Sequence, residues 1–154
     1  MSVFKKDIAY QELINKLSDL KSLTKAENEA TTRLRIINTI LFDILNWDKT
    51  QIETEKYCRQ EGYADYVFHI NNNPYLVLEA KKTGTSFILT DKVFEKRPYA
   101  FGLFSKECSK ASEAFQQVIG YAATLGARYV AISNGHQWIF SLTYVPNQPL
   151  ARTA

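Results

Sequence analysis

The sequence of 154 residues has only two cysteines, and neither belongs to a short metal-binding or redox motif. Cys58 and Cys108 lie far apart and form no C-x-x-C pair. A structural zinc site needs about four ligands, and these cysteines, together with His69 and His136, show none of the usual spacings. The pattern therefore predicts two reduced thiols, as in a cytoplasmic protein.

Long apolar runs, internal repeats and Pro/Gly/Ser-rich linkers are also missing. No run reaches the length that crosses a bilayer, and Met1 to Lys6 leads into a polar helical stretch rather than a secretory signal. We expect a soluble cytoplasmic protein with no membrane partner. We also expect a single domain over residues 1–145. Residues 146–154, which include Pro146 and Pro149, would leave it toward further domains outside this sequence.

The charge has no strong sign, since 19 basic and 16 acidic residues give a formal net charge of +3. A mildly basic surface favours an encounter with nucleic acid, but an ordinary solvated surface carries this much charge as well. Apolar residues make up 45% of the chain, which is typical of a globular protein with a real core.

Three helices are predicted. The first covers about residues 5–21 and has a loose apolar stripe. The second begins at Thr24, because Thr24 and Glu27 have the spacing of a capping box, and its core face comprises Leu34, Ile37, Ile40, Leu41, Ile44 and Leu45. The third covers residues 109–125 and ends at Gly126, the residue expected just past a helix.

Strand patterns occupy most of the remaining sequence. Residues 51–57, 63–70 and 75–81 alternate as strands, and the cluster from Asn71 to Pro74 predicts a turn between the last two. Residues 128–133 form a buried strand, and Asn134-Gly135 predicts a tight hairpin into residues 136–144. The order α-α-β-β-β-α-β-β predicts an α/β domain with a mixed central sheet. Residues 83–107 show no clear pattern.

The predicted hairpin of residues 63–81 places charged groups side by side. If Ile70 pairs with Tyr75, Asp65 lies opposite Ala80, within one residue of register, and therefore beside Glu79. Carboxylates on directly opposed strand positions are ~5 Å apart, close enough to share a divalent cation. Glu79 and Lys81 share one face because strand side chains alternate.

An ordinary reading of this charged stretch exists. Glu79, Lys81 and Lys82 could be solvated charges where a buried strand reaches water. Asp65 weighs against that reading, because it lies among apolar and aromatic residues, where an unpaired carboxylate is costly. Asp65 therefore needs a cation, and a metal ion is one candidate.

Five segments resemble one nuclease family. Gly62-Tyr63-Ala64-Asp65-Tyr66 and Leu76-Val77-Leu78-Glu79-Ala80-Lys81-Lys82 resemble the active-site hairpin of the PD-(D/E)xK nuclease superfamily. In particular they resemble the N-terminal endonuclease domain of the restriction subunit of type I restriction enzymes. The further segments, in the expected order, are Asn28 to Arg33 running on to Asp48, Gln117-Val118-Ile119-Gly120-Tyr121 as a Q-x-x-x-Y motif, and Ala131 to Trp138 as a terminal hairpin.

The resemblance implies a restriction-endonuclease-like core and a metal-dependent DNA endonuclease of a restriction or phage-defence system. Asp65, Glu79 and the backbone carbonyl of Ala80 would hold Mg²⁺, for which Mn²⁺ would substitute. The metal would polarise the scissile phosphate and lower the pKa of a bound water. Lys81 would position that water and offset charge on the phosphate.

Three other residues have two readings each. Glu29 corresponds to an acid of the family's N-terminal helix and would reach the metal through water. It could equally be a first-turn acid that favours the helix dipole. Gln117 and Tyr121 share a helical face, and by resemblance they would contact the DNA backbone or support Lys81. Otherwise they simply pack that helix on the sheet.

The departures from the family pattern limit the prediction. Ala64 replaces the proline that names the superfamily, and the stretch from residue 83 to 108 is longer than the common pattern. No phosphate-binding G-x-x-x-x-G-K-[ST] loop is present, so any motor or sensor function belongs to other domains or subunits.

The substrate expected is double-stranded DNA, and two alternatives stay open. The chain could be a nucleic-acid-binding module without catalysis, or a nuclease that acts on RNA or single-stranded DNA. Trp138 and Phe140 are interpreted as core residues rather than base-stacking platforms.

Overall fold

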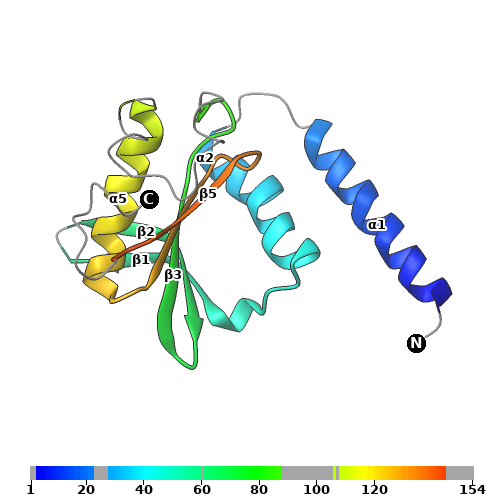
Figure 1. Ribbon diagram of the computed structural model, residues 1–154, viewed down its shortest axis with the longest axis horizontal. Coiled ribbons are helices and arrows are strands. Elements are labelled where there is room, and N and C mark those ends of the chain that lie inside the picture. Colours follow the sequence, from blue (N-terminus) through cyan, green and yellow to red (C-terminus); the bar gives the residue numbers. More distant parts are fainter. Residues whose placement is uncertain (1–2, 23–27, 60, 88–105, 107, 145–154) are drawn as a thin grey trace.

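A computed structural model describes residues 3–22, 28–59, 61–87, 106 and 108–144, with backbone alone for residues 3–10. Its centre is a mixed sheet in the order β1-β2-β3-β4-β5, in which β3 and β4 run parallel and the other neighbours run antiparallel. Residues 109–125 cover one face of this sheet and residues 29–44 lie on the other (Figure 1). The strands are β1 (Ile52–Cys58), β2 (Gly62–Ile70), β3 (Asn73–Ala80), β4 (Tyr129–Ser133) and β5 (Trp138–Leu142). The prediction of an α/β domain with a mixed sheet is confirmed.

The β2–β3 hairpin has a tighter turn than the sequence indicated. Asn71 and Asn72 take φ of 51° and 63° and alone form the turn, so Ile70 pairs with Asn73 rather than with Tyr75. Asparagine tolerates this left-handed conformation, which a two-residue hairpin turn needs at both positions. A shift of register after Phe68 compensates.

Beyond that shift the hairpin register is one residue from the predicted one. Tyr66 pairs with Leu78, so one step further along the strands Asp65 lies beside Glu79. The predicted neighbourhood of the two acids is therefore present, although the predicted pair at the turn was wrong.

Helix α5 (Ser109–Leu125) has the predicted bounds. Gly126 ends it with φ of 75°, a conformation that suits glycine because it has no Cβ. Phe115 and Val118 are fully buried against the sheet, next to Val67 and Val130. Burial of such a side chain contributes ~1.5 to 3 kcal/mol, so α5 is firmly packed.

The second helix begins later than predicted. Its N-cap is Asn28, which is extended and accepts a hydrogen bond from the Thr31 N–H, so α2 (Glu29–Thr32) starts at Glu29 and not at Thr24. Thr24 and Glu27 themselves lie outside the described residues.

This helix continues through two π-helical segments, η1 (Arg33–Ile37) and η2 (Thr39–Ile44). A π turn takes more residues than an α turn, so the 3.6-residue pattern no longer marks the buried face. Of the predicted core face, Ile37 and Leu41 are buried as expected, but Leu34 and Leu45 are 68% and 59% exposed. Ile36, which was not predicted in the core, is buried.

The β4–β5 connection is a four-residue loop rather than a two-residue turn, because Ser133 pairs with Trp138. Asn134 shapes it: its side-chain oxygen accepts the N–H groups of His136 and Gln137. The strand β5 therefore begins at Trp138 and not at residue 136. Phe140, interpreted as core, is 63% exposed, because β5 lies at the sheet edge.

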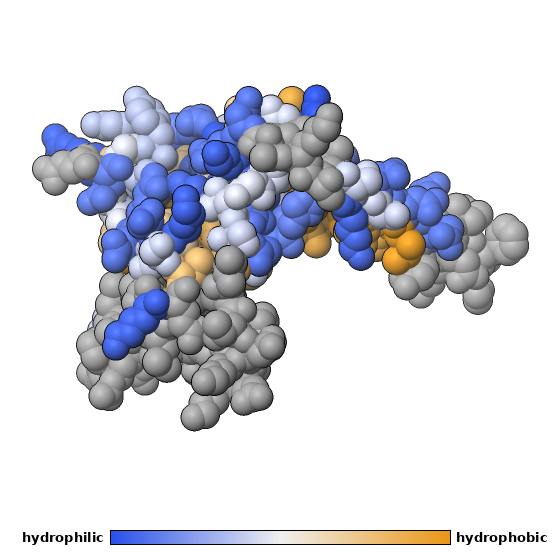
Figure 2. Space-filling model, turned by 90° about the horizontal axis from the view of Figure 1, so that it is seen from above, coloured by the Kyte–Doolittle hydropathy of each residue, from blue (hydrophilic) through white to orange (hydrophobic). Residues whose placement is uncertain are grey.

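Helix α1 (Val3–Ser22) matches the predicted first helix and stands apart from the sheet (Figure 1). Figure 2 shows it projecting from the body, with hydrophobic residues along one side. Within the described ranges, no helix combines the length and apolar character that a membrane span requires. The predicted exit segment of residues 146–154 lies outside these ranges.

An apolar groove of about 390 Å³ lies between η2 and the sheet. Its lining contains only apolar side chains, among them Ile40, Leu45, Trp47, Leu76 and Phe140. The helix on this face is therefore packed less completely than α5 on the other.

Candidate active site

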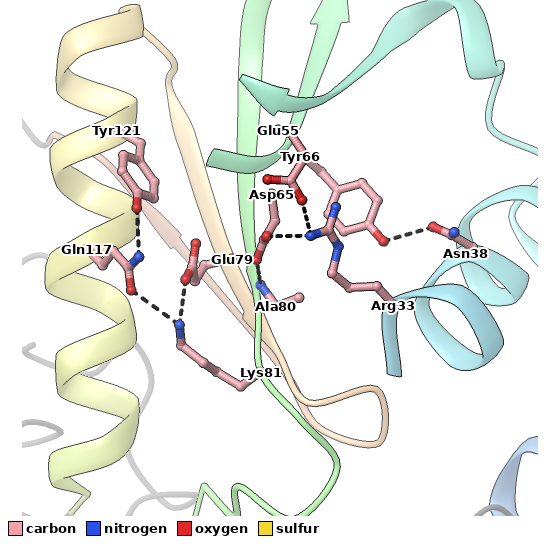
Figure 3. Close-up of polar contacts among 10 residues, drawn as sticks. All are labelled: Arg33, Asn38, Glu55, Asp65, Tyr66, Glu79, Ala80, Lys81, Gln117 and Tyr121. Atoms are coloured by element: carbon pink, nitrogen blue, oxygen red, sulfur yellow. Dashed lines mark hydrogen bonds and ion pairs between the residues drawn. The ribbon is translucent and has the colours of Figure 1, made fainter. Parts of the chain in front are cut away.

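The predicted acids lie at one end of the β2–β3 hairpin, between the two helical layers (Figure 3). Asp65 is 6% exposed and Glu79 3% exposed. Lys81 follows the last residue of β3 and is half-buried. The structure thus brings together the three residues that the sequence predicted as the catalytic centre.

Asp65 has a partner on each carboxylate oxygen. Its Oδ2 accepts the backbone N–H of Ala80 at 2.8 Å, and its Oδ1 lies 2.9 Å from a guanidinium nitrogen of Arg33. Arg33 also pairs with Glu55 and lies over the ring of Tyr66 at 5.2 Å. The sequence predicted that the backbone carbonyl of Ala80 is a metal ligand, and this stays a prediction. The structure shows in addition that the Ala80 N–H holds the Asp65 carboxylate.

Glu79 and Lys81 form a second chain of contacts that reaches α5. Lys81 Nζ lies 2.5 Å from Glu79 Oε1 and donates to Gln117 Oε1 at 3.2 Å. Gln117 Nε2 in turn donates to the hydroxyl of the buried Tyr121 at 2.6 Å. Gln117 thus contacts Lys81, as a support would, while Tyr121 is buried in the core, as the packing reading expects. Contact with the DNA backbone stays a prediction.

Burial perturbs the charges of both acids. It raises the pKa of Glu79 to about 7, with a further rise from the nearby Asp65 carboxylate, against which Lys81 acts. Burial also raises the pKa of Asp65, although the Ala80 N–H and Arg33 oppose the shift. Burial acts to lower the pKa of Lys81, but Glu79 outweighs it and the net shift is upward. The site therefore holds two carboxylates that would both ionise more readily with another cation present.

One buried carboxylate oxygen shows whether these residues suit a bound metal ion. Glu79 Oε2 is buried and has no hydrogen-bond partner within the part of the chain that the structure describes. A buried acceptor without a partner costs ~1 to 3 kcal/mol. It belongs to the carboxylate that lies beside Asp65 (Figure 3). Oxygen donors from two carboxylates suit Mg²⁺, which keeps several waters and takes other ligands from substrate.

A fuller protein-only metal cage is absent from the described ranges, where no group of three or more His, Cys, Asp or Glu side chains is arranged to hold an ion. Glu29 supplies additional negative charge. It lies half-buried in the first turn of α2, and its charge raises the pKa of both Asp65 and Glu79. A water-mediated metal contact of Glu29 stays a prediction.

Sequence reasoning missed Arg33 and Glu55 as site residues. Arg33 stands one helical turn after Glu29, a spacing that could have placed both on one face. The sequence gives a weaker signal for Glu55. On β1 its two neighbours pair with Ala64 and Tyr66, so Glu55 lies opposite Asp65. Its left-handed φ of 53° is seen only in the structure.

No family model, curated protein or solved structure matches this chain.

Proposed function

We propose that this chain is a metal-dependent nuclease domain of the PD-(D/E)xK type that hydrolyses phosphodiester bonds in DNA. The observation that carries the proposal is the convergence of Asp65, Glu79 and Lys81. One oxygen of the buried Glu79 carboxylate has no hydrogen-bond partner among the residues that the structure describes. The five resembling segments support it. Double-stranded DNA as the substrate and a restriction or phage-defence system as the setting are part of the same proposal.

Asp65 and Glu79 would hold Mg²⁺, or Mn²⁺ in its place. When bound, the metal would polarise the scissile phosphate and lower the pKa of a water. Its charge would also favour the ionised form of Glu79, whose pKa near 7 otherwise leaves it partly protonated at neutral pH.

Lys81 would orient the attacking water and offset the charge that develops on the phosphate. Its ammonium group is held from two sides, by Glu79 and by Gln117. A donor fixed before the reaction costs little reorganisation during it. Gln117 would thus act through Lys81 as a positioning residue, and the buried Tyr121 would fix Gln117.

The same contacts weigh against a binding module without catalysis. Such a module would need basic residues toward the phosphates, whereas Lys81 is held between an acid and an amide, and the buried Glu79 repels DNA. Burying two acids and a lysine together at the end of a hairpin costs desolvation free energy. A metal-binding catalytic site would explain why the protein keeps these charges there.

The test uses plasmid nicking with Mg²⁺. Lys81→Ala should lower the rate by ~10² to 10³, as for other losses of one well-placed electrostatic contact. Lys82→Ala is the matched control, because Lys82 is exposed and has the same charge. Its rate should stay within a few-fold of wild type. Equal activity of the two variants would contradict the assignment, and an equal loss in both would indicate general attraction of DNA, which added salt should mimic.

A further inference from the structure

Asp65 is already paired with a cation, and that cation belongs to the protein. Arg33 reaches from η1 to Asp65 Oδ1 at 2.9 Å, and its side chain is only 18% exposed. Asp65 Oδ2 meanwhile accepts the Ala80 N–H. Any metal ion that binds Asp65 must therefore share or take an oxygen that already has a partner.

Arg33 has a second carboxylate to hold. Its NH1 also pairs with Glu55, whose side chain is 57% exposed and whose backbone has the left-handed φ of 53°. The ring of Tyr66 lies beside the guanidinium, and the Tyr66 hydroxyl donates to Asn38 at 2.8 Å, which fixes that ring. Figure 3 shows the Glu55 and Asp65 carboxylates both in contact with the same guanidinium nitrogen of Arg33. With Glu55 and Tyr66 in place, Arg33 can leave Asp65 without becoming an unpaired cation.

We propose that Arg33 occupies Asp65 as a counter-ion in the metal-free protein and is displaced toward Glu55 when a divalent cation binds, so that Arg33 and Glu55 set the affinity of the site for the cation. This inference rests on the proposed function, because it needs Asp65 to be a metal ligand. Arg33 and Glu55 are then positioning residues: Arg33 lowers the affinity of the site for the cation, and Glu55 raises it.

The reasoning predicts effects of opposite sign. Without Arg33 the cation meets less repulsion and no competitor, so Arg33→Gln should tighten Mn²⁺ binding by about tenfold. Without Glu55, Asp65 is the one carboxylate among the described residues that pairs with the guanidinium. Glu55→Gln should therefore weaken Mn²⁺ binding by about threefold or more. A purely structural role would lower the melting temperature in both variants without this divergence.

The experiment is titration calorimetry of the purified chain with Mn²⁺ at pH 8, where Glu79 is largely ionised. Lys56→Gln and Glu53→Gln are matched controls, because they make the same charge changes on β1 in an ion pair with each other. Both controls should bind Mn²⁺ within about twofold of wild type, as expected for exposed charges.

A second readout is thermal unfolding with and without Mn²⁺. Arg33→Gln should unfold at a lower temperature than wild type in the absence of metal, since Asp65 loses its partner, yet gain more from Mn²⁺. If Arg33→Gln does not fold, Glu55→Gln decides: weakened binding supports the inference, and unchanged or tighter binding overturns it.

The outcomes separate this inference from the proposed function. Binding by wild type that Asp65→Asn abolishes, but that Arg33→Gln leaves unchanged, overturns the counter-ion role alone. Absence of Mn²⁺ binding in wild type and in Arg33→Gln contradicts the metal site itself, and the inference with it. If Arg33→Gln and Lys56→Gln tighten Mn²⁺ binding equally, the change in affinity reflects only the overall charge of the protein. That result would also overturn the inference.

Discussion

Replacing Glu79 by glutamine measures the free energy that the metal-free site costs the fold. The pKa of Glu79 is raised from its ordinary value of 4.5 to about 7, first by burial and then by Asp65. The unfolded chain therefore releases the proton at lower pH than the folded chain does. The folded state therefore loses stability as the pH rises from about 4.5 through about 7. Below about pH 4.5 Glu79 is protonated in both states, and this loss of stability disappears.

The size of the effect follows from the two pKa values. Between pH 5 and pH 8 the linkage amounts to ~2 to 3 kcal/mol for this one carboxyl. Glu79→Gln cannot ionise, so its free energy of unfolding should fall less over the same range, and the two curves should diverge by that amount. The ion pair with Lys81 is already included in this pKa, which it lowers, so its loss in the variant adds no further pH dependence.

The assay is urea unfolding at a series of pH values in the presence of a chelator. Glu12→Gln, which removes an exposed carboxyl from α1, is the control and should run parallel to wild type. Adding Mg²⁺ should reduce the divergence, because a bound cation stabilises the ionised carboxylate. Parallel curves for wild type and Glu79→Gln without metal would refute the argument from burial.

Three further changes give direct tests. Asp65→Asn should abolish the Mg²⁺ or Mn²⁺ binding detected by calorimetry, and equal binding by wild type and variant would place the site elsewhere. Gln117→Ala should reduce plasmid nicking at least several-fold, because Lys81 loses a support, with little change in melting temperature; a large drop in melting temperature with full activity would instead favour a packing role. Gly135→Ala should cost ~1 to 3 kcal/mol of stability in thermal unfolding, because φ is +90° and a Cβ would lie 2.9 Å from Ile36; an unchanged melting temperature would contradict this.

The parts of the fold that the sequence predicted well depend on local chemistry. The bounds of α5 follow from its apolar spacing and from Gly126. The β2–β3 hairpin follows from alternation and from asparagines that accept a left-handed backbone. Because that hairpin also carries Asp65 and Glu79, most of the candidate site could be predicted along with it.

The parts that could not be predicted depend on contacts between distant segments. The π turns of η1 and η2 shift which residues face the sheet, and a pattern analysis that assumes 3.6 residues per turn cannot detect them. Arg33 lies far from Asp65 in sequence. Its spacing from Glu29 indicates a shared helical face, but not that its guanidinium reaches β2. Phe140 shows the same limit, because its exposure depends on the place of β5 at the sheet edge.

The two helices that flank the site differ in how firmly they are held, and this difference has a consequence for how the site loosens. On one side α5 buries a continuous face against the sheet. On the other side, η2 lies over the apolar groove. Both η1 and η2 are π-helical, with long-period backbone hydrogen bonds such as Leu45 N–H to the Ile40 carbonyl at 2.9 Å.

Amide hydrogen exchange should therefore be faster in residues 33–45 than in residues 111–122. Gentle warming would release the helix that carries Arg33 while α5 still holds Lys81 through Gln117. The contacts of Lys81 with Glu79 and Gln117 would then persist at temperatures at which the contact of Arg33 with Asp65 is already lost.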